Sequence, residues 1–320
     1  MEKGTLGQIC SERNTSPRRR AGASFFHLLV SMYSLLFSIA AYAQVSFVDP
    51  GRDPAPDKAH PARLEAVHIP SHGVKFNGAL YVAAGATPHP TAVFLKGVPG
   101  IEQNLDLAQA VRRAGWNALT MHTRGMWGSP GVFSYQHLLE DASAALGFVR
   151  EPENLSGYAI DPNRVVLIGY STGGFIAALT AADTRGVAGL ILISAPDDAR
   201  DALVASKSPA LWKEVVKGYA DYTDGLAGCT PEGLAKEALR HVDAWNLAAA
   251  AQRLNALPVL IINSDDGYAP DSEALGDAID HQGGRTTTRI HMNTDHAYSD
   301  HRIALQHAVV DWLQRHFPAQ

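Results

Sequence analysis

The sequence predicts an α/β fold: a mostly parallel sheet of about eight strands with helices on both faces. Short apolar runs alternate along the chain with longer stretches of helical pattern, and this alternation is typical of a doubly wound sheet. Most of the runs are apolar throughout, which indicates strands that are buried on both faces. Hydrophobic residues make up 46% of the 320 residues, so the chain can bury one large core or two modest ones.

The first two strands are expected over Leu64–Pro70 and Lys75–Ala83, joined as a hairpin at Ser71-His72-Gly73. Six later apolar runs predict the remaining strands: Thr91–Leu95, Asn117–Met121, Arg164–Ile168, Leu190–Ile193, Val259–Ile262 and Arg289–Met292. Five other stretches have a helical pattern: Leu105–Ala114, His137–Val149, Gly173–Ala182, Ser272–His281 and Arg302–Phe317.

One segment interrupts the alternation. From Asp197 to about Asn255 there is no clear strand, and two tryptophans and two tyrosines lie among alanines and charged residues. We expect residues 197–255 to form a small helical insertion over the carboxyl ends of the strands, where ligands bind in such sheets. An ordinary pair of helices packed on the side of the sheet is the alternative.

Residues 1–43 have the features of a secretory signal peptide. Arg18-Arg19-Arg20 precede an uncharged run over Phe25–Ala43, which ends in Ala41-Tyr42-Ala43. We expect cleavage after Ala43 and a periplasmic or secreted protein without stable membrane association. An uncleaved membrane anchor is the alternative, because the run is close to spanning length. Residues 44–63 follow as a linker rich in proline, aspartate and glycine.

Composition argues against several classes of function. The formal net charge is −5 and the pI about 6.3, so no basic face is implied and nucleic-acid binding is not expected. No phosphate-binding glycine motif and no His/Cys cluster with metal-ligand spacing occurs, so we expect neither a cofactor nor a metal. Loss of Cys10 with the signal peptide would leave Cys229 alone, as a structural thiol.

The pentapeptide Gly169-Tyr170-Ser171-Thr172-Gly173 is the most informative motif. An apolar run that predicts a buried strand precedes it, and small apolar residues that predict a buried helix follow it. A serine on a sharp turn between a strand and a helix is exposed for nucleophilic attack, and the strained turn requires small neighbours. Gly169 and Gly173 meet that requirement, so Ser171 is the expected nucleophile.

A serine hydroxyl needs a base to take its proton, and the base needs a carboxylate that orients it. The segment after Val259–Ile262 contains Asp265 and Asp266, and the segment after the last strand contains His296. Both segments follow the carboxyl ends of strands, so we expect them on the same rim as Ser171.

With these motifs the chain resembles the α/β-hydrolase superfamily, near its dienelactone-hydrolase-like and prolyl-oligopeptidase-like branches, from about Leu64 to the C-terminus. In such proteins the acid commonly lies four residues before a proline, as Asp266 does before Pro270. Their histidine commonly lies in a D-H-x-F/Y-like loop, which His296 matches. The resemblance therefore implies a catalytic triad of Ser171, Asp266 and His296.

The position of the acid leaves alternatives open. Asp265 is the second choice, because it is adjacent to Asp266 in the same loop. Asp197 or Asp198, which follow the preceding strand, are more remote options that occur in relatives of this fold.

The resemblance also implies an oxyanion hole made of two backbone amides. One belongs to Thr172, the residue after the nucleophile, and the other to Val98 in the loop Lys96-Gly97-Val98-Pro99-Gly100, which is similar to the family's H-G-x-P-G. Gly97 lets the backbone approach the substrate. Lys96 departs from the pattern, because histidine is usual at its position.

A second glycine-rich loop, residues 124–131, follows the strand over Asn117–Met121. It is similar to an R-G-x-G-x-S-x-G-like loop that shapes the pocket in relatives, and Trp127 within it is a candidate for contact with the substrate. A purely structural Gly/Pro turn is the alternative.

We therefore expect residues 64–320 to be one catalytic domain: a serine hydrolase that cleaves a carboxylic ester through an acyl-enzyme. Its expected partner is a small-molecule ester or a short peptide. The chain has no room for a large accessory domain, and the aromatic residues of the insertion suit an apolar acyl or alcohol group. Three glutamates in the insertion keep an aminoacyl-peptidase-like activity open: Glu214, Glu232 and Glu237.

Two further alternatives use the same fold. An acyltransferase would share the triad and differ only in the access of water to the acyl-enzyme. A catalytically silent binding protein would lack a member of the triad, and the sequence contains all three.

We predict that the protein recovered from the periplasm or the medium begins at Gln44, because the arginines hold the cytoplasmic side while the apolar run carries the rest across. N-terminal sequencing is the measurement. An intact Phe25–Ala43 segment in a membrane fraction would instead support the anchored alternative.

Overall fold

The computed structural model describes residues 48–283 and 287–318. The predicted signal peptide and the first residues of the predicted linker lie outside these described residues. Residues 48–62 contain no helix or strand, and the first strand begins at Arg63, the last residue of the predicted linker. No helix within the described part of the chain is long and apolar enough to cross a membrane.

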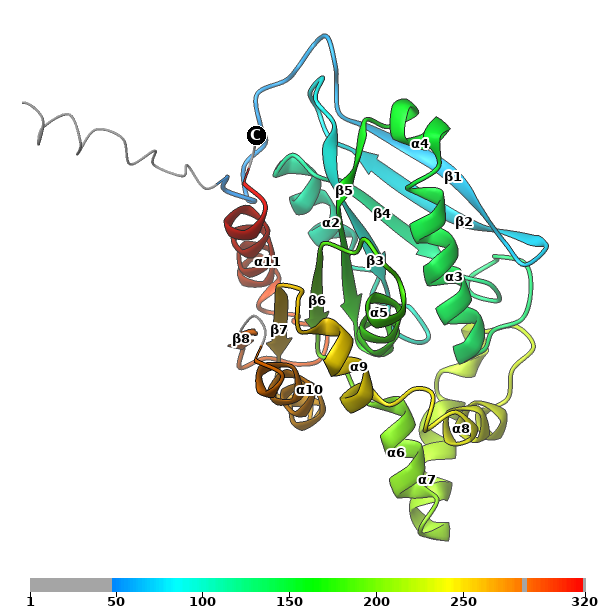
Figure 1. The fold of residues 1–320 in the computed structure, drawn as a ribbon. Helices are drawn as coiled ribbons and strands as arrows, with labels where there is room; N and C mark the ends of the chain where they lie inside the picture. Colours follow the sequence, from blue (N-terminus) through cyan, green and yellow to red (C-terminus); the bar gives the residue numbers. More distant parts are fainter. Residues whose placement is uncertain (1–47, 284–286, 319–320) are drawn as a thin grey trace, which may run out of the picture. The chain divides into compact units, whose positions relative to one another are not determined.

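Eight strands form one mixed sheet in the order β1-β2-β4-β3-β5-β6-β7-β8 (Figure 1). The hairpin of β1 and β2 pairs antiparallel with β4, and all later pairs are parallel. This is the predicted fold class. The strands are β1 Arg63–Ser71, β2 Val74–Val82, β3 His89–Leu95, β4 Asn117–His122, β5 Ile160–Tyr170, β6 Gly189–Ile193, β7 Val259–Asn263 and β8 Thr288–His291.

Helices cover both faces of the sheet, as the fully apolar strands require. Successive residues of β3 show the division: Val93 packs into one hydrophobic core, Phe94 into the other, and Leu95 into the first again. The helices with buried residues in the core of Val93 are α3 Tyr135–Phe148, α5 Thr172–Asp183, α6 Asp198–Ala205, α8 Pro231–Arg240, α9 Leu247–Leu254 and α10 Ala269–His281. Those on the face of Phe94 are α2 Leu105–Arg113 and α11 Arg302–His316.

Two local features differ from the sequence prediction. A short helix, α4 Pro152–Gly157, has no buried residue and therefore produces no apolar pattern. The strand β5 begins at Ile160 rather than Arg164, because Ile160 pairs with His89 across an irregularity in the ladder. Polar residues between these positions conceal the early start of the strand.

The segment between β6 and β7 is helical, as predicted, but it divides into two parts. The elements α6 Asp198–Ala205, α7 Pro209–Ala220, η1 Thr223–Gly225 and α8 Pro231–Arg240 lie beyond one end of the sheet (Figure 1). The last helix, α9, packs against α5 and α10. Residues of α6, α8 and α9 all contribute to the core that contains α5.

Candidate active site

Ser171 lies on the turn between β5 and α5 in a strained backbone conformation. Its φ is 53° and its ψ −134°, in a region that residues other than glycine rarely adopt. The amide of Ser171 donates a hydrogen bond to the carbonyl of Ile193 at the end of β6 (2.9 Å), and its carbonyl accepts one from Gly174 (2.7 Å). The strand–turn–helix context expected for a nucleophilic serine is therefore present.

Glycines around this turn allow the backbone segments to approach each other. A Cβ at Gly173 would collide with the carbonyl of Leu95, and one at Gly169 with the carbonyl of Gly173. A Cβ at Gly174 would lie 2.5 Å from that of Ala195. The close contacts bring the first turn of α5 against the carboxyl end of β3, where the loop of residues 96–100 begins.

The two predicted oxyanion amides belong to residues next to the serine turn: Thr172 follows Ser171, and Val98 follows Gly97, which approaches the serine. A Cβ at Gly97 would lie only 2.8 Å from the Cβ and 3.2 Å from the Oγ of Ser171, so the loop before Val98 touches the serine. Thr172 is the first residue of α5, where amides have no partner inside the helix. Outside regular helix and strand pairing, neither amide donates a hydrogen bond to another described residue. Both are therefore available to an external acceptor.

Asp266 and His296 form a hydrogen-bonded pair, 2.8 Å from Oδ2 to Nδ1. The carboxylate is almost fully buried and accepts further hydrogen bonds from the Ser264 hydroxyl (2.8 Å) and the Tyr268 amide (2.9 Å). Burial alone would raise the pKa of Asp266, but these hydrogen bonds, that of His296 foremost, outweigh it and hold the pKa well below its ordinary value. The carboxyl is therefore an anion at any ordinary pH.

The imidazole of His296 is placed next to the serine turn. It lies against Tyr170, the residue before Ser171, with ring centroids 5.0 Å apart, and the Tyr170 hydroxyl donates to the carbonyl of His296 (3.1 Å). On another side it meets the ring of Tyr268 at 5.3 Å. The Oγ of Ser171 makes no hydrogen bond to His296 in this structure. Such contacts are often long in unliganded enzymes and tighten around the substrate.

The alternative acids have other partners. Asp265 pairs with His291 (2.8 Å), and both side chains are about half exposed. Asp197 accepts a hydrogen bond from the Arg200 amide at the start of α6. Asp198 is buried near Thr172, and burial raises its pKa to about 7. Among the described residues, none of the three forms a hydrogen bond or ion pair with His296.

Trp127 connects the two glycine-rich loops, which the sequence did not predict. Its indole nitrogen donates to the carbonyl of Pro99 (2.6 Å), and its side chain is 48% exposed beside the loop that contains Val98. The loop also pairs with the insertion, because Met126 and Leu226 form an isolated β-bridge. Trp127 thus lies where the candidate site meets the insertion.

Arg124, at the start of the same loop, has a structural role. Its guanidinium is buried and binds Asp141 (2.6 Å) and Glu140 (2.6 Å) on α3. For this residue the alternative of a structural turn is correct.

Two of the three glutamates considered for a peptide amino terminus, Glu232 and Glu237, have other partners, and Glu214 is exposed. Glu237 accepts hydrogen bonds from the amides of Tyr135 and Gln136 at the start of α3. Glu232 pairs with Lys236 and accepts a hydrogen bond from Trp212.

Lys96, the departure from the family pattern, is buried next to the candidate oxyanion loop. Its Nζ lies 2.5 Å from Nδ1 of His122, the last residue of β4. The sequence motif shows that lysine is unusual at this position, but it does not predict His122 as the partner of Lys96.

No group of three potential metal ligands occurs within the described ranges. Cys229 is a half-buried free thiol, and burial raises its pKa.

Comparison with known proteins agrees with this fold. The model of the alpha/beta hydrolase family matches residues 93–310. The structure is similar to ferulic acid-bound Est1E from Butyrivibrio proteoclasticus (17% identity, 79% of this chain, 100% of that chain, TM-score 0.61). It is also similar to a Rhizomucor miehei esterase (17%, 90% of each chain, 0.60). A Pyrococcus horikoshii acylaminoacyl peptidase is matched over 80% of this chain but 42% of that one (16%, 0.58). A search of the curated proteins found no match.

We predict that Asp266→Asn slows ester hydrolysis by about 10⁴-fold, because an amide favours the wrong tautomer of His296. Asp265→Asn is the matched control and should stay within about threefold, since its carboxylate binds His291 at the surface. Steady-state kcat/KM for both variants is the measurement. Equal and small losses in both would direct attention to Asp197 or Asp198.

Proposed function

The chain belongs to the alpha/beta hydrolase family, and on that premise we propose that it is a serine hydrolase that cleaves a carboxylic ester. One observation carries the proposal: strained Ser171 is pressed against the Gly97 loop, and the Asp266–His296 pair lies against the preceding residue, Tyr170. These contacts support a site in which Ser171 is the nucleophile, His296 the base and Asp266 its orienting acid, with the amides of Val98 and Thr172 as candidate donors.

In the proposed reaction, Ser171 Oγ attacks the ester carbonyl carbon while His296 takes its proton. Asp266 holds Nδ1 of the imidazole, so that Nε2 faces the reacting groups, and its negative charge stabilises the imidazolium. The amides of Val98 and Thr172 donate to the oxyanion. His296 then protonates the leaving alcohol, and water releases the acyl group from Ser171 in a second, mirrored cycle.

The surroundings support an ester rather than a peptide. The aromatic side chains of Trp127 and Tyr222 are 48% and 41% exposed, and Tyr268 contacts the ring of His296. Such surfaces suit an apolar acyl or alcohol group. The resemblance to an acylaminoacyl peptidase keeps a peptidase as the second candidate, although this chain spans less than half of that protein.

Export to the periplasm or the medium is part of the proposal and is supported by the sequence of residues 1–43.

Ser171→Ala should reduce turnover by at least about 10⁴-fold and leave folding intact, because the attacking oxygen is lost while the packing remains. Ser143→Ala, on the exposed side of α3, is the matched control and should retain activity. A fluorophosphonate probe should label the wild type and the control but not the first variant. Labelling or normal turnover of Ser171→Ala would place the nucleophile elsewhere.

We predict a higher kcat/KM on p-nitrophenyl esters of short or medium acyl chains than on matched aminoacyl or prolyl anilides. An ester has the better leaving group, and the aromatic residues near the site suit an apolar acyl or alcohol group. Glu232 and Glu237 already bind other groups of the protein, so they are not free to bind the amino terminus of a peptide. Parallel steady-state kinetics on the purified mature protein decides the question. Faster cleavage of an anilide would favour the peptidase.

A further inference from the structure

Lys96 is a buried lysine whose amino group has no acidic partner among the described residues. Its residue is only 9% exposed, and among the described residues it forms no ion pair with a carboxylate. Within the described ranges, the one side chain that forms a hydrogen bond with its Nζ is the imidazole of His122, at 2.5 Å. A buried amine costs stability unless it is well compensated, so a lysine in this position calls for a functional explanation.

The loop of the candidate oxyanion hole is folded over the side chain of Lys96. A Cβ at Gly100, whose φ is +82°, would lie 2.7 Å from Cε and 3.1 Å from Nζ of the lysine. The carbonyl of Pro99 is held by Trp127 (2.6 Å). Residues 97–100 are therefore enclosed between the lysine stem and the indole, which restricts the direction of the Val98 amide.

The loop that contains Trp127 also contacts His122, the partner of Lys96. The Ser129 hydroxyl, two residues after Trp127, donates to the carbonyl of His122 (2.5 Å). The imidazole of His122 in turn binds Lys96. The loop before the nucleophile and the loop of residues 124–131 thus share one closed set of contacts that passes through the lysine.

The charge of Lys96 changes near neutral pH. Burial lowers the pKa of Lys96 to about 7. Burial, together with the charge of Lys96, lowers the pKa of His122 to about 4. At pH 5–6 the ammonium therefore donates to a neutral imidazole, and above neutral pH the pair carries no charge.

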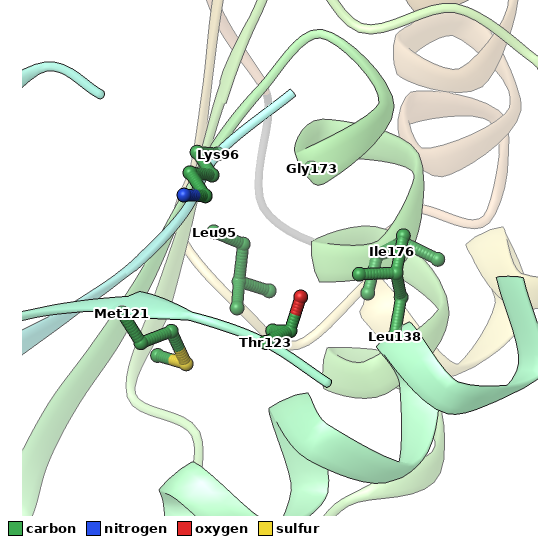
Figure 2. A pocket seen from close by; sticks show the side chains of 7 residues that line it. All are labelled: Leu95, Lys96, Met121, Thr123, Leu138, Gly173 and Ile176. Carbon is green, nitrogen blue, oxygen red and sulfur yellow. The ribbon is translucent and has the colours of Figure 1, made fainter. Parts of the chain in front are cut away.

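Few other titratable groups face the lysine. From β4 it meets His122, and among the residues that line the two small cavities beside it only Tyr170, on β5, titrates as well. The walls from α3 and α5 are Leu138, Gly173 and Ile176. In Figure 2 the amino group of Lys96 points away from these apolar side chains.

We propose that Lys96 is a positioning residue of the oxyanion hole: its ammonium, held by His122, orients the Val98 loop. The inference rests on the proposed function, because it assumes that Ser171 forms a tetrahedral intermediate. An amide that is held in the direction of the developing oxyanion favours the transition state over the neutral ester. Lys96 would then contribute to catalysis while it destabilises the folded state.

The test is Lys96→Met, which keeps a side chain about as long as the lysine stem as far as Cε and removes the amine. At pH 6 we expect kcat to fall about tenfold, less than the ~10²–10³ of a lost oxyanion donor. The wild type should lose activity as Lys96 deprotonates above about pH 7, so the two proteins should converge by pH 9. Lys75→Met, an exposed change on β2, is the matched control and should follow the wild-type profile.

Thermal unfolding separates this role from simple packing. In the unfolded chain Lys96 keeps its proton to about pH 10.5, whereas the folded protein releases it near pH 7, so the lysine lowers stability most at and below neutral pH. Lys96→Met should therefore raise Tm, and by more at pH 6 than at pH 10. In a second variant, His122→Leu, the ammonium loses its acceptor and the alkaline loss of activity should move to lower pH.

Three results would overturn the inference. These are Lys96→Met with the wild-type pH profile, an equal loss at every pH with a lowered Tm, or a variant that fails to fold. The last two would show that the lysine only supports packing. Fluorophosphonate labelling of Ser171 distinguishes these results from a failure of the proposed function. A wild type that neither labels nor turns over esters would refute the hydrolase itself and this inference with it.

Discussion

The contact between the first turn of α5 and the carboxyl end of β3 determines the geometry of the whole candidate site. At Gly173 there is no space for a Cβ against the carbonyl of Leu95, and Gly169 packs equally closely on Gly173. Because the helix lies so near the sheet, the chain must turn sharply at Ser171. The same approach brings Gly97, two residues beyond Leu95, against the serine. A larger side chain at these glycines would separate the nucleophile from the candidate oxyanion loop.

Electrostatics divides the buried ionisable groups near this turn into two kinds. The carboxylate of Asp266 accepts enough hydrogen bonds to remain an anion despite burial. Asp198 is also buried, but its Oδ2 has no hydrogen-bond partner among the described residues, and its pKa rises to about 7. An orienting acid must stay ionised while the histidine carries a proton. This requirement favours Asp266, and it follows from the hydrogen bonds that each carboxyl receives.

The insertion contacts the loop of residues 124–131, which lies beside the candidate site. Met126 pairs with Leu226, and the amide of Ala227 donates to the carbonyl of Gly125 (2.8 Å). Tyr219 on α7 binds the hydroxyl of Tyr135 on α3 (2.9 Å). A change in the insertion would therefore reach Trp127 and, through Pro99, the loop beside Ser171. In the proposed hydrolase these contacts connect substrate selection with the oxyanion hole.

The sequence by itself determined the sheet, most of its strands and the position of Ser171. Fully apolar runs indicate strands that are buried on both faces, and a serine flanked by glycines between a strand and a helix indicates a tight turn. Both patterns lie within a few consecutive residues, so they can be recognised without the tertiary structure. It predicted Asp266 and His296 from loop patterns, and the structure joins them by a hydrogen bond between residues thirty positions apart. Their roles in catalysis remain predictions.

The tertiary structure alone decided the partners of residues that are distant along the chain. Lys96 meets His122, Trp127 meets Pro99, Arg124 meets Asp141, and α9 packs against α5 and α10. None of these contacts leaves a periodic signal, because each depends on how two strands or loops are brought together. The charge of a buried group is decided in the same way, since desolvation and hydrogen bonds arise only when the chain has folded.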